Sequence, residues 1–206
     1  MIQSGKFDLS KMDIKKLANS VFIFTVNRLI EIFGIIISVV GILLFISLIS
    51  YSPADPNFIF PENTQIKNFL GFQGSYTSDL FFQSIGIVSY LVPLSFFFTG
   101  INIFNKKQIF LLIENSFFII SYSIIGSIFF GYFYSNAFEL YINGNGGFVG
   151  NYLNQNFFNN LIIKNEILFY YFFIVLIIFL FLYSINFNVT TFSSFLKKFA
   201  NTLFRD

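Results

Sequence analysis

The chain has 206 residues, of which 55% are hydrophobic and only 11% are charged, and its mean hydropathy is +0.73. A soluble domain of this length needs a charged surface that this chain lacks, so the composition excludes an ordinary water-soluble protein and indicates a lipid environment. The formal net charge of +2 is small and no basic stripe carries interleaved aromatic residues, which argues against nucleic-acid binding.

Two residue types that carry much of enzyme chemistry are absent. The chain has no Cys and no His, which excludes disulfides, thiolate nucleophiles, thiolate metal sites and the commonest general base. Ten carboxylates are the conventional acid–base groups that remain. We therefore expect no catalytic residues, no metal site and no bound cofactor in this chain.

The first predicted element is a short amphipathic helix within residues 1–27. Lys11, Lys15 and Asn19 lie off its apolar stripe, and Ser10 is positioned to cap it. The stripe has helical spacing and consists of Ile14, Leu17, Ala18, Val21, Phe22 and Thr25. We predict an interfacial helix that lies on the cytoplasmic surface of the membrane.

The first predicted membrane span covers residues 29–51. A helix needs about 20 apolar residues to cross about 30 Å of hydrocarbon, and this run is long enough. Gly34 and Gly41 are spaced for close helix packing, either within the bundle or between subunits. Glu31 follows Arg28 on the same helix face, which predicts an ion pair at the membrane interface rather than a proton relay.

A first long loop is expected after this span, because two prolines favour turns where the helix ends. The second predicted span covers residues 80–104. Asp79 lies just before it and is expected to cap the helix, as are its neighbours Thr77 and Ser78. Pro93 within the span lacks an N–H donor, so we expect a kink at mid-membrane.

The third predicted span covers residues 109–134. It follows the second span after a turn of only residues 105–108, so the two helices are predicted to be antiparallel neighbours. Glu114 lies one turn inside this span and is expected at the membrane interface. Small residues at successive i+4 steps form a second helix-packing face, which consists of Ser123, Ser127 and Gly131.

A second long loop is expected over residues 135–166, because residues 143–150 are too rich in glycine to remain helical. These glycines do not fit the G-x-G-x-x-G nucleotide-binding pattern, since Val149 occupies the third glycine position, and no lysine follows to make a phosphate loop. A tight turn in which backbones pack closely is the favoured interpretation. The fourth predicted span covers residues 167–187, and residues 188–206 are expected to begin a cytoplasmic linker.

The basic residues indicate the orientation, because positively charged loops stay in the cytoplasm. Ten of the twelve Lys and Arg residues fall at the termini or in the short turn, and Lys67 and Lys164 fall in the long loops. The ten are Lys6, Lys11, Lys15, Lys16, Arg28, Lys106, Lys107, Lys197, Lys198 and Arg205. We predict an all-α membrane protein whose residues 28–187 form four transmembrane helices, with both termini cytoplasmic and both long loops extracytoplasmic.

The outer loops carry Tyr, Asp-Pro, Asn and Gly residues in a distinctive order. These residues are Tyr51, Asp55, Pro56, Asn68, Gly71, Gly74, Asp79, Gly86, Tyr90, Gly146, Gly147, Val149 and Gly150. With them, positions 28–187 resemble the amino-terminal membrane domain of the FtsK/SpoIIIE family of DNA translocases. Ser75 and Ser78 depart from the pattern, because alanine is expected at both positions.

The resemblance implies a membrane-anchoring, septum-targeting and self-association domain of a cell-division translocase that serves chromosome partition. It also implies the bacterial inner membrane as the location, a homo-oligomer, a hexamer in this family, and other membrane proteins of the division machinery as partners. The sequence contains no G-x-x-x-x-G-K-[ST] and ends at Asp206. We therefore expect the ATPase motor, with its ATP and magnesium, to be absent from this chain, and we expect no nucleic acid to bind it directly.

Two other functions are alternatives to this one. A small transporter or channel subunit would pass its substrate beside Pro93, Ser121, Ser123 and Ser127, but the sequence shows no inverted repeat and no charge at mid-membrane. A lipid-modifying enzyme would need partners for interfacial carboxylates such as Asp55, and no recognisable partner is present.

Overall fold

Four long apolar helical stretches dominate the computed structural model, which describes residues 14–56, 65–135 and 143–188, together with residues 190, 193, 194 and 197. The segment 1–13, with its predicted cap Ser10, and most of the predicted linker at 188–206 lie outside the described residues. The regular elements of the described part are all helical, and four stretches are long and apolar enough to cross a membrane. The predicted all-α fold with four spans is confirmed.

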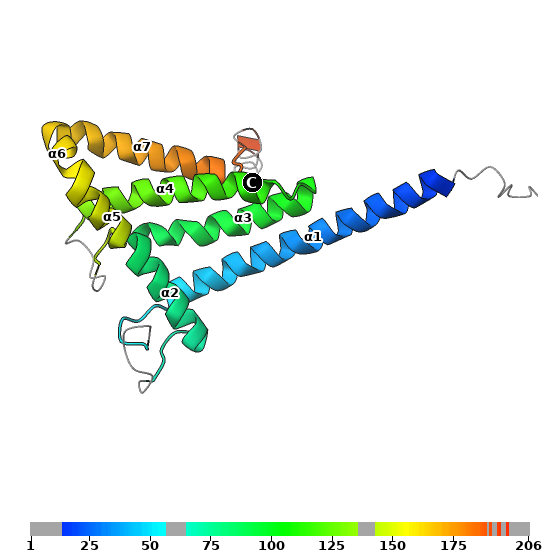
Figure 1. The fold of residues 1–206 in the computed structure, drawn as a ribbon, viewed down its shortest axis with the longest axis horizontal. Coiled ribbons are helices and arrows are strands. Elements are labelled where there is room, and N and C mark those ends of the chain that lie inside the picture. The colour runs from blue at the N-terminus through cyan, green and yellow to red at the C-terminus, as the bar shows by residue number, and fades with distance from the viewer. Residues whose placement is uncertain are drawn as a thin grey trace, which may run out of the picture.

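The first span is part of one long helix, α1 (Ile14–Ile49), of 36 residues. At 1.5 Å per residue it is about 54 Å long, which exceeds the thickness of the hydrocarbon core. The surface helix predicted within residues 1–27 is therefore not a separate element, because from Ile14 onward it continues straight into the span (Figure 1). No Gly or Pro precedes Gly34 in this helix, so nothing interrupts its backbone hydrogen bonds.

The second span is reached through an elbow. The helix α2 (Gly71–Ile85) runs into a short 3-10 helix, η2 (Gly86–Tyr90), and then into α3 (Leu91–Lys106), which points in a different direction (Figure 1). Gly86 has φ +70° and ψ −147°, a conformation that is essentially restricted to glycine. The bend therefore lies at η2 and not at Pro93. Pro93 is the third residue of α3, where a backbone N–H has no partner within the helix anyway.

Asp79 does not cap the second span as predicted, and neither do Thr77 and Ser78. All three lie inside α2, which begins at Gly71 rather than near residue 80 and has no side-chain cap at its start. Gly71 has φ +63° and turns the chain into the helix. The prediction failed because residues 71–79 are too polar to resemble a membrane span, although they are helical.

The third and fourth spans are α4 (Leu111–Phe133) and α7 (Glu166–Ser184), which pack against each other. The helices α3 and α4 are also neighbours, as the short turn between them predicts. Lys107 adopts the left-handed conformation, with φ +56°, and ends α3.

Much of the predicted second loop is helical. Gly144 and Gly147 both have φ +63° and form the turn from which the helix begins. The glycine cluster therefore starts a helical stretch instead of excluding one. The segments that follow are α5 (Gly147–Leu153), a π-helical turn (Asn154–Phe158), α6 (Asn159–Ile162) and a 3-10 turn (Ile163–Asn165).

The bundle has two different ends, which we call the loop end and the turn end (Figure 1). The loop end holds α2, η2, α5 and α6, and the turn end holds residues 107–110 between α3 and α4. The start of α1 and the end of α7 both lie toward the turn end (Figure 1).

The outer surface of the spans is strongly apolar. Ile36 of α1 is 52% exposed and Val175 of α7 is 66% exposed, and such faces are favourable in lipid but not in water. One buried cluster joins α1, α2, η2, α3 and α4, and a second joins α4, α6 and α7. Their members are Leu44, Leu48, Phe82, Val88, Val92, Ile119 and Tyr122, and Ile128, Phe129, Ile162 and Phe173.

Candidate functional site

The residues that carry the family resemblance gather at the loop end, in two junctions between helices. The Asp55 junction connects the end of α1 to α2, and consists of Ser47, Tyr51, Asp55, Pro56, Asn68, Gly74, Ser75 and Asp79. The glycine junction connects the elbow, α4 and α5, and consists of Gly86, Ser127, Gly131, Asn145, Gly146, Gly147 and Gly150. Gly71 and Tyr90 lie next to these junctions, at the start of α2 and the end of η2.

Asp55 is the most buried carboxylate of the described chain and is 2% exposed. Its two oxygens accept hydrogen bonds from the backbone N–H groups of Lys67, at 2.9 Å, and Asn68, at 2.8 Å. Charge-assisted bonds of this kind offset part of the cost of burying the carboxylate. Asp55 thus holds together the two described parts of the first loop.

Asn68 links the end of α1 to the start of α2. Its side-chain amide donates to the carbonyl oxygens of Ser47, at 2.9 Å, and Ser50, at 3.3 Å, while its Oδ1 accepts from the N–H of Leu70 at 3.1 Å. The last carbonyls of a helix have no partner within the helix. Asn68 supplies partners for them, and it is 5% exposed.

Three further hydrogen bonds hold α2 against the end of α1 and the first loop. The hydroxyl of Ser47 donates to the carbonyl of Gly74 at 2.7 Å. Ser75 donates to the carbonyl of Pro56 at 2.7 Å, and Tyr51 donates to the carboxylate of Asp79 at 3.2 Å. A Cβ on Gly74 would overlap the side chain of Asn68, so glycine permits this close approach.

In the glycine junction, backbones meet without side chains between them. The N–H of Ile87 donates to the carbonyl of Asn145 at 3.0 Å, and a Cβ on Gly86 would overlap that carbonyl. A Cβ on Gly147 would lie 2.6 Å from the backbone of Gly86 and Ser84. Such contacts exclude every residue except glycine unless the backbone moves.

The small-residue face of α4 forms the other side of this junction. A Cβ on Gly146 would lie 2.5 Å from the carbonyl oxygen of Ser127 and 2.6 Å from Cα of Gly131, and Gly150 also lies against Ser127. The Ser127 hydroxyl donates to the carbonyl of Ile85 at 2.9 Å. Ser123 is buried, and its hydroxyl has no hydrogen-bond partner among the described residues.

The glycine face of α1 packs on α3. A Cβ on Gly34 would lie 2.7 Å from the carbonyl oxygen of Gly100, and a Cβ on Gly41 would lie 2.7 Å from the amide nitrogen of Phe97. Both small-residue faces predicted from the sequence therefore make contacts within this chain. The alternative use between subunits is not needed to explain them.

At the turn end, Glu31 is 8% exposed and pairs with two cations. Its carboxylate lies 2.5 Å from the guanidinium of Arg28 and 3.2 Å from the ammonium of Lys107. The pair with Arg28 follows the sequence spacing, but Lys107 comes from the turn between α3 and α4. Glu31 thereby joins α1 to that turn.

A buried polar network that holds the end of α7 was missed by sequence reasoning. The Ser184 hydroxyl lies 2.7 Å from that of Ser95, the Asn115 amide donates to Thr99 at 2.9 Å, and the Asn186 amide donates to Asn115 Oδ1 at 2.6 Å. The i, i+4 spacing of Ser95 and Thr99 in an apolar helix was the available signal, because interhelical hydrogen bonds favour such pairs in membranes.

The end of α7 is also capped by its own backbone. The N–H of Asn186 donates to the carbonyl of Tyr183 at 2.9 Å, and the N–H of Phe187 donates to the carbonyl of Leu182 at 3.0 Å. Asn186 has φ +52°, as expected for the left-handed residue of a Schellman motif. The direction in which the chain leaves α7 is thus set by backbone and side-chain bonds together.

The polar groups of these junctions form hydrogen bonds that hold the helices together. Asp55 and Asp79 are buried, and their carboxylate oxygens accept hydrogen bonds within the fold. In the described ranges, no three His, Cys, Asp or Glu side chains are grouped to hold a metal ion. The arrangement fixes the relative positions of the helices.

Comparison with known proteins gives one match to a family. Residues 26–197 match the family described as the 4TM region of DNA translocase FtsK/SpoIIIE. This range includes all four spans and both junctions. No solved structure matches the chain.

Individual relatives are also named DNA translocase FtsK. The Rickettsia bellii protein is 28% identical over 184 residues, which cover 88% of this chain and 23% of that protein. The Azospirillum brasilense protein is 38% identical over 73 residues, or 34% of this chain and 12% of that protein. The Rickettsia prowazekii protein is 30% identical over 83 residues, or 39% of this chain and 11% of that protein. The chain thus spans about a quarter of the length of the Rickettsia bellii protein.

Proposed function

The chain belongs to the FtsK/SpoIIIE family through its 4TM region, and from this premise we propose that it is the membrane anchor of a DNA translocase that acts at the division septum. The match over residues 26–197 is the observation that carries the proposal. In this proposal the ATP-dependent motor is contributed from outside this segment. The chain itself needs no bound cofactor and makes no contact with DNA.

The proposal includes an orientation in which the turn end faces the cytoplasm. Lys106 and Lys107 belong to the turn end, and Arg28 is paired with Glu31 beside them. Lys67 and Lys164 belong to the loop end. Because cytoplasmic segments carry the excess of Lys and Arg, this distribution supports a cytoplasmic turn end. The capped end of α7 then directs the chain toward a cytoplasmic motor.

We also propose that the anchor self-associates, as a hexamer in keeping with the family. Its glycine faces are occupied within the chain, so subunits would meet through the lipid-facing sides of the spans.

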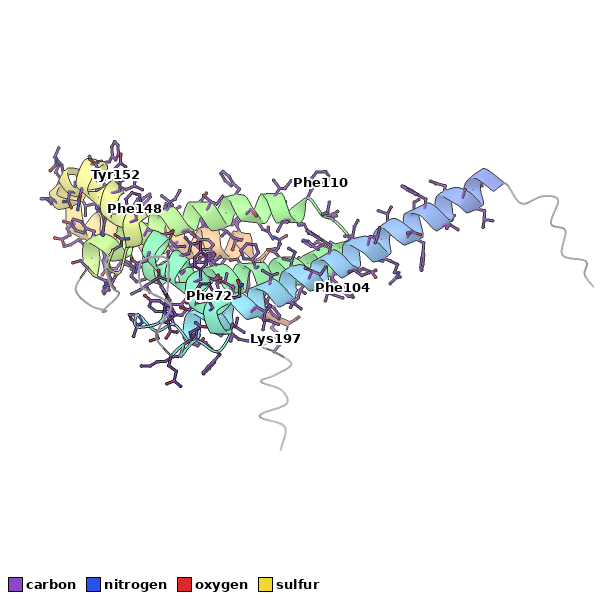
Figure 2. The ribbon with its side chains drawn as sticks, turned by 60° about the horizontal axis from the view of Figure 1, so that its bottom comes forward. Phe72, Phe104, Phe110, Phe148, Tyr152 and Lys197 are labelled. Carbon is purple, nitrogen blue, oxygen red and sulfur yellow. The ribbon has the colours of Figure 1, made fainter. Side chains whose placement is uncertain are left out.

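Partner proteins of the division machinery would meet the loop end, where exposed aromatic side chains gather. Phe69 is 78% exposed, and Phe148 and Tyr152 project outward from α5 (Figure 2). Exposed aromatic residues of this kind are enriched both at membrane interfaces and in protein interfaces.

Nothing in the described geometry favours the transporter alternative. Pro93 and Ser127 are buried against neighbouring helices, and Ser121 donates to the carbonyl of Phe117 on its own helix. These residues therefore do not line one common path.

Fluorescence microscopy of the chain, tagged at its carboxyl end, tests the septal role. The host is Azospirillum brasilense, because its translocase is one of the relatives. We expect the tagged chain to concentrate at midcell in dividing cells, while an unrelated four-span protein with the same tag stays evenly distributed. An even distribution of this chain at normal membrane levels would contradict the septal role.

A further inference from the structure

A pocket of about 590 Å³ lies at the turn end, between the end of α3, the start of α4 and the end of α7. Its polar side chains include Lys106, Glu114 and Asn186, and its apolar side chains include Phe179, Leu182 and Tyr183. The volume falls within the range of small-molecule sites. Neither the junctions nor the proposed anchoring role uses this pocket.

The pocket combines a cation and an anion that do not satisfy each other. The ammonium of Lys106 donates to Oδ1 of Asn186 at 3.1 Å, which leaves two of its three donors for another partner. Glu114 is exposed and forms no ion pair with any described residue. Lys107 is close to Glu114 along the turn, but its ammonium pairs with Glu31.

The apolar wall of the pocket belongs to the lipid-facing side of α7. The rings of Phe179 and Tyr183 are in contact, with centroids 4.6 Å apart, and the two side chains are 51% and 52% exposed. Lys106 ends α3 and Glu114 lies in the first turn of α4, so the polar groups lie at the ends of the spans, where lipid headgroups are expected. A polar mouth above an exposed aromatic wall matches a lipid, which has a polar head and apolar chains.

We propose that this pocket binds a zwitterionic phospholipid with a primary amine, of the phosphatidylethanolamine type. The phosphate accepts hydrogen bonds from the free donors of Lys106, and the ammonium of the headgroup donates to the carboxylate of Glu114. An acyl chain lies along Phe179 and Tyr183. An anionic lipid without an amine, such as phosphatidylglycerol, offers Glu114 no cationic partner, so the negative charge of its phosphate is not offset beside that carboxylate.

Such a lipid bridges α3 and α4 beside the point where the chain leaves α7. The lipid site requires that the chain resides in a membrane, and it does not require the septal role. A negative result for the lipid site therefore does not count against the septal role, and a negative result for the septal role does not count against the lipid site.

Native mass spectrometry of the full chain in mild detergent, with equal amounts of the two lipids, tests the proposal. We expect retained phosphatidylethanolamine to exceed phosphatidylglycerol about fivefold, which corresponds to about 1 kcal/mol. Glu114→Gln should bring the ratio close to one, and Lys106→Gln should lower the retention of both lipids. The conservative variants Lys106→Arg and Glu114→Asp should keep the preference, which separates loss of the site from loss of folding.

Matched charge changes at the loop end, Lys164→Gln and Glu166→Gln, should leave the ratio unchanged. Soluble phosphoethanolamine at the concentration of the lipid should not displace it, because the aromatic wall binds the acyl chain; displacement would overturn the assignment to a lipid. Equal retention of both lipids by the unaltered chain, a preference that survives Glu114→Gln, or undiminished retention of both lipids by Lys106→Gln would overturn the site itself.

Discussion

At the scale of single residues, the glycines of the second outer loop differ in what they do. Gly144 and Gly147 share φ +63°, but a Cβ on Gly144 would meet nothing within 4 Å. A Cβ on Gly147 would lie 2.6 Å from the backbone of the elbow. The first position thus needs glycine for its backbone conformation alone, and the second needs it for packing as well.

Replacing each of these glycines by alanine separates the two effects. We expect Gly144→Ala to lower the free energy of unfolding by about 1–2 kcal/mol, the cost of a left-handed L-residue. Gly147→Ala should lower it by about 1–3 kcal/mol more, because backbone must move to admit the methyl group. Unfolding titrations in mixed micelles measure both values. Equal losses in the two variants would mean that the glycine junction does not depend on this contact.

Part of the site at this scale was predictable from sequence. The family resemblance singles out Asp55, Asn68 and Asp79, and the run of glycines in residues 143–150 itself predicts close packing of backbones. Their partners were not predictable, because the N–H groups that bind Asp55 and the hydroxyl that binds Asp79 come from distant positions. The polar neighbours of Asp79 predict a helix cap at this position, whereas Asp79 lies within a helix that packs on α1.

At the scale of elements, the end of α7 is held more firmly than an isolated helix terminus. Asn186 combines a left-handed backbone, with φ +52°, and a side-chain bond of 2.6 Å to Asn115 on α4. Asn115 is completely buried, so the loss of this partner leaves its Oδ1 without a donor. The end of α7 and the buried amide of Asn115 on α4 therefore both depend on the side chain of Asn186.

Two substitutions at this position test the arrangement. Asn186→Gly keeps the left-handed conformation and removes the side-chain bond, so we expect a loss of about 1–3 kcal/mol in the free energy of unfolding. Asn186→Ala removes the bond and also strains the backbone, which should add about 1–2 kcal/mol. Thermal unfolding and hydrogen exchange at residues 185–187 report the two effects. A glycine variant as stable as the unaltered chain would show that the network does not hold α7.

The spans were predictable at this scale, because long apolar runs are the strongest signal that a membrane helix leaves in a sequence. The boundaries of the spans were less predictable than the spans themselves. The elbow at η2 depends on the conformation of Gly86, which contacts Asn145 some sixty residues later, and no local pattern contains that contact. The helical start of α2 was missed because it packs on α1 instead of facing lipid.

At the scale of the whole molecule, the fold separates two ends with different contents. The loop end holds both junctions, which consist largely of the residues that carry the family resemblance. The turn end holds the turn between α3 and α4, the ion pairs of Glu31 with Arg28 and Lys107, and the end of α7. Figure 2 shows Phe148 and Tyr152 at the loop end, far from Phe110 at the other. In the proposed orientation, the loop end faces one side of the membrane, and the start of α1 and the end of α7 lie toward the other.

The claim that both chain ends face the cytoplasm is tested most directly by cysteine accessibility, because the chain has no cysteine of its own. Single variants place a thiol at the loop end, Ser135→Cys, in the short turn, Gln108→Cys, and near the carboxyl end, Lys197→Cys. With a membrane-impermeant maleimide, we predict that Ser135→Cys is labelled in spheroplasts with an intact inner membrane, and that the other two are labelled only after permeabilisation. Labelling of Gln108→Cys or Lys197→Cys in intact spheroplasts, with Ser135→Cys protected, would contradict the account.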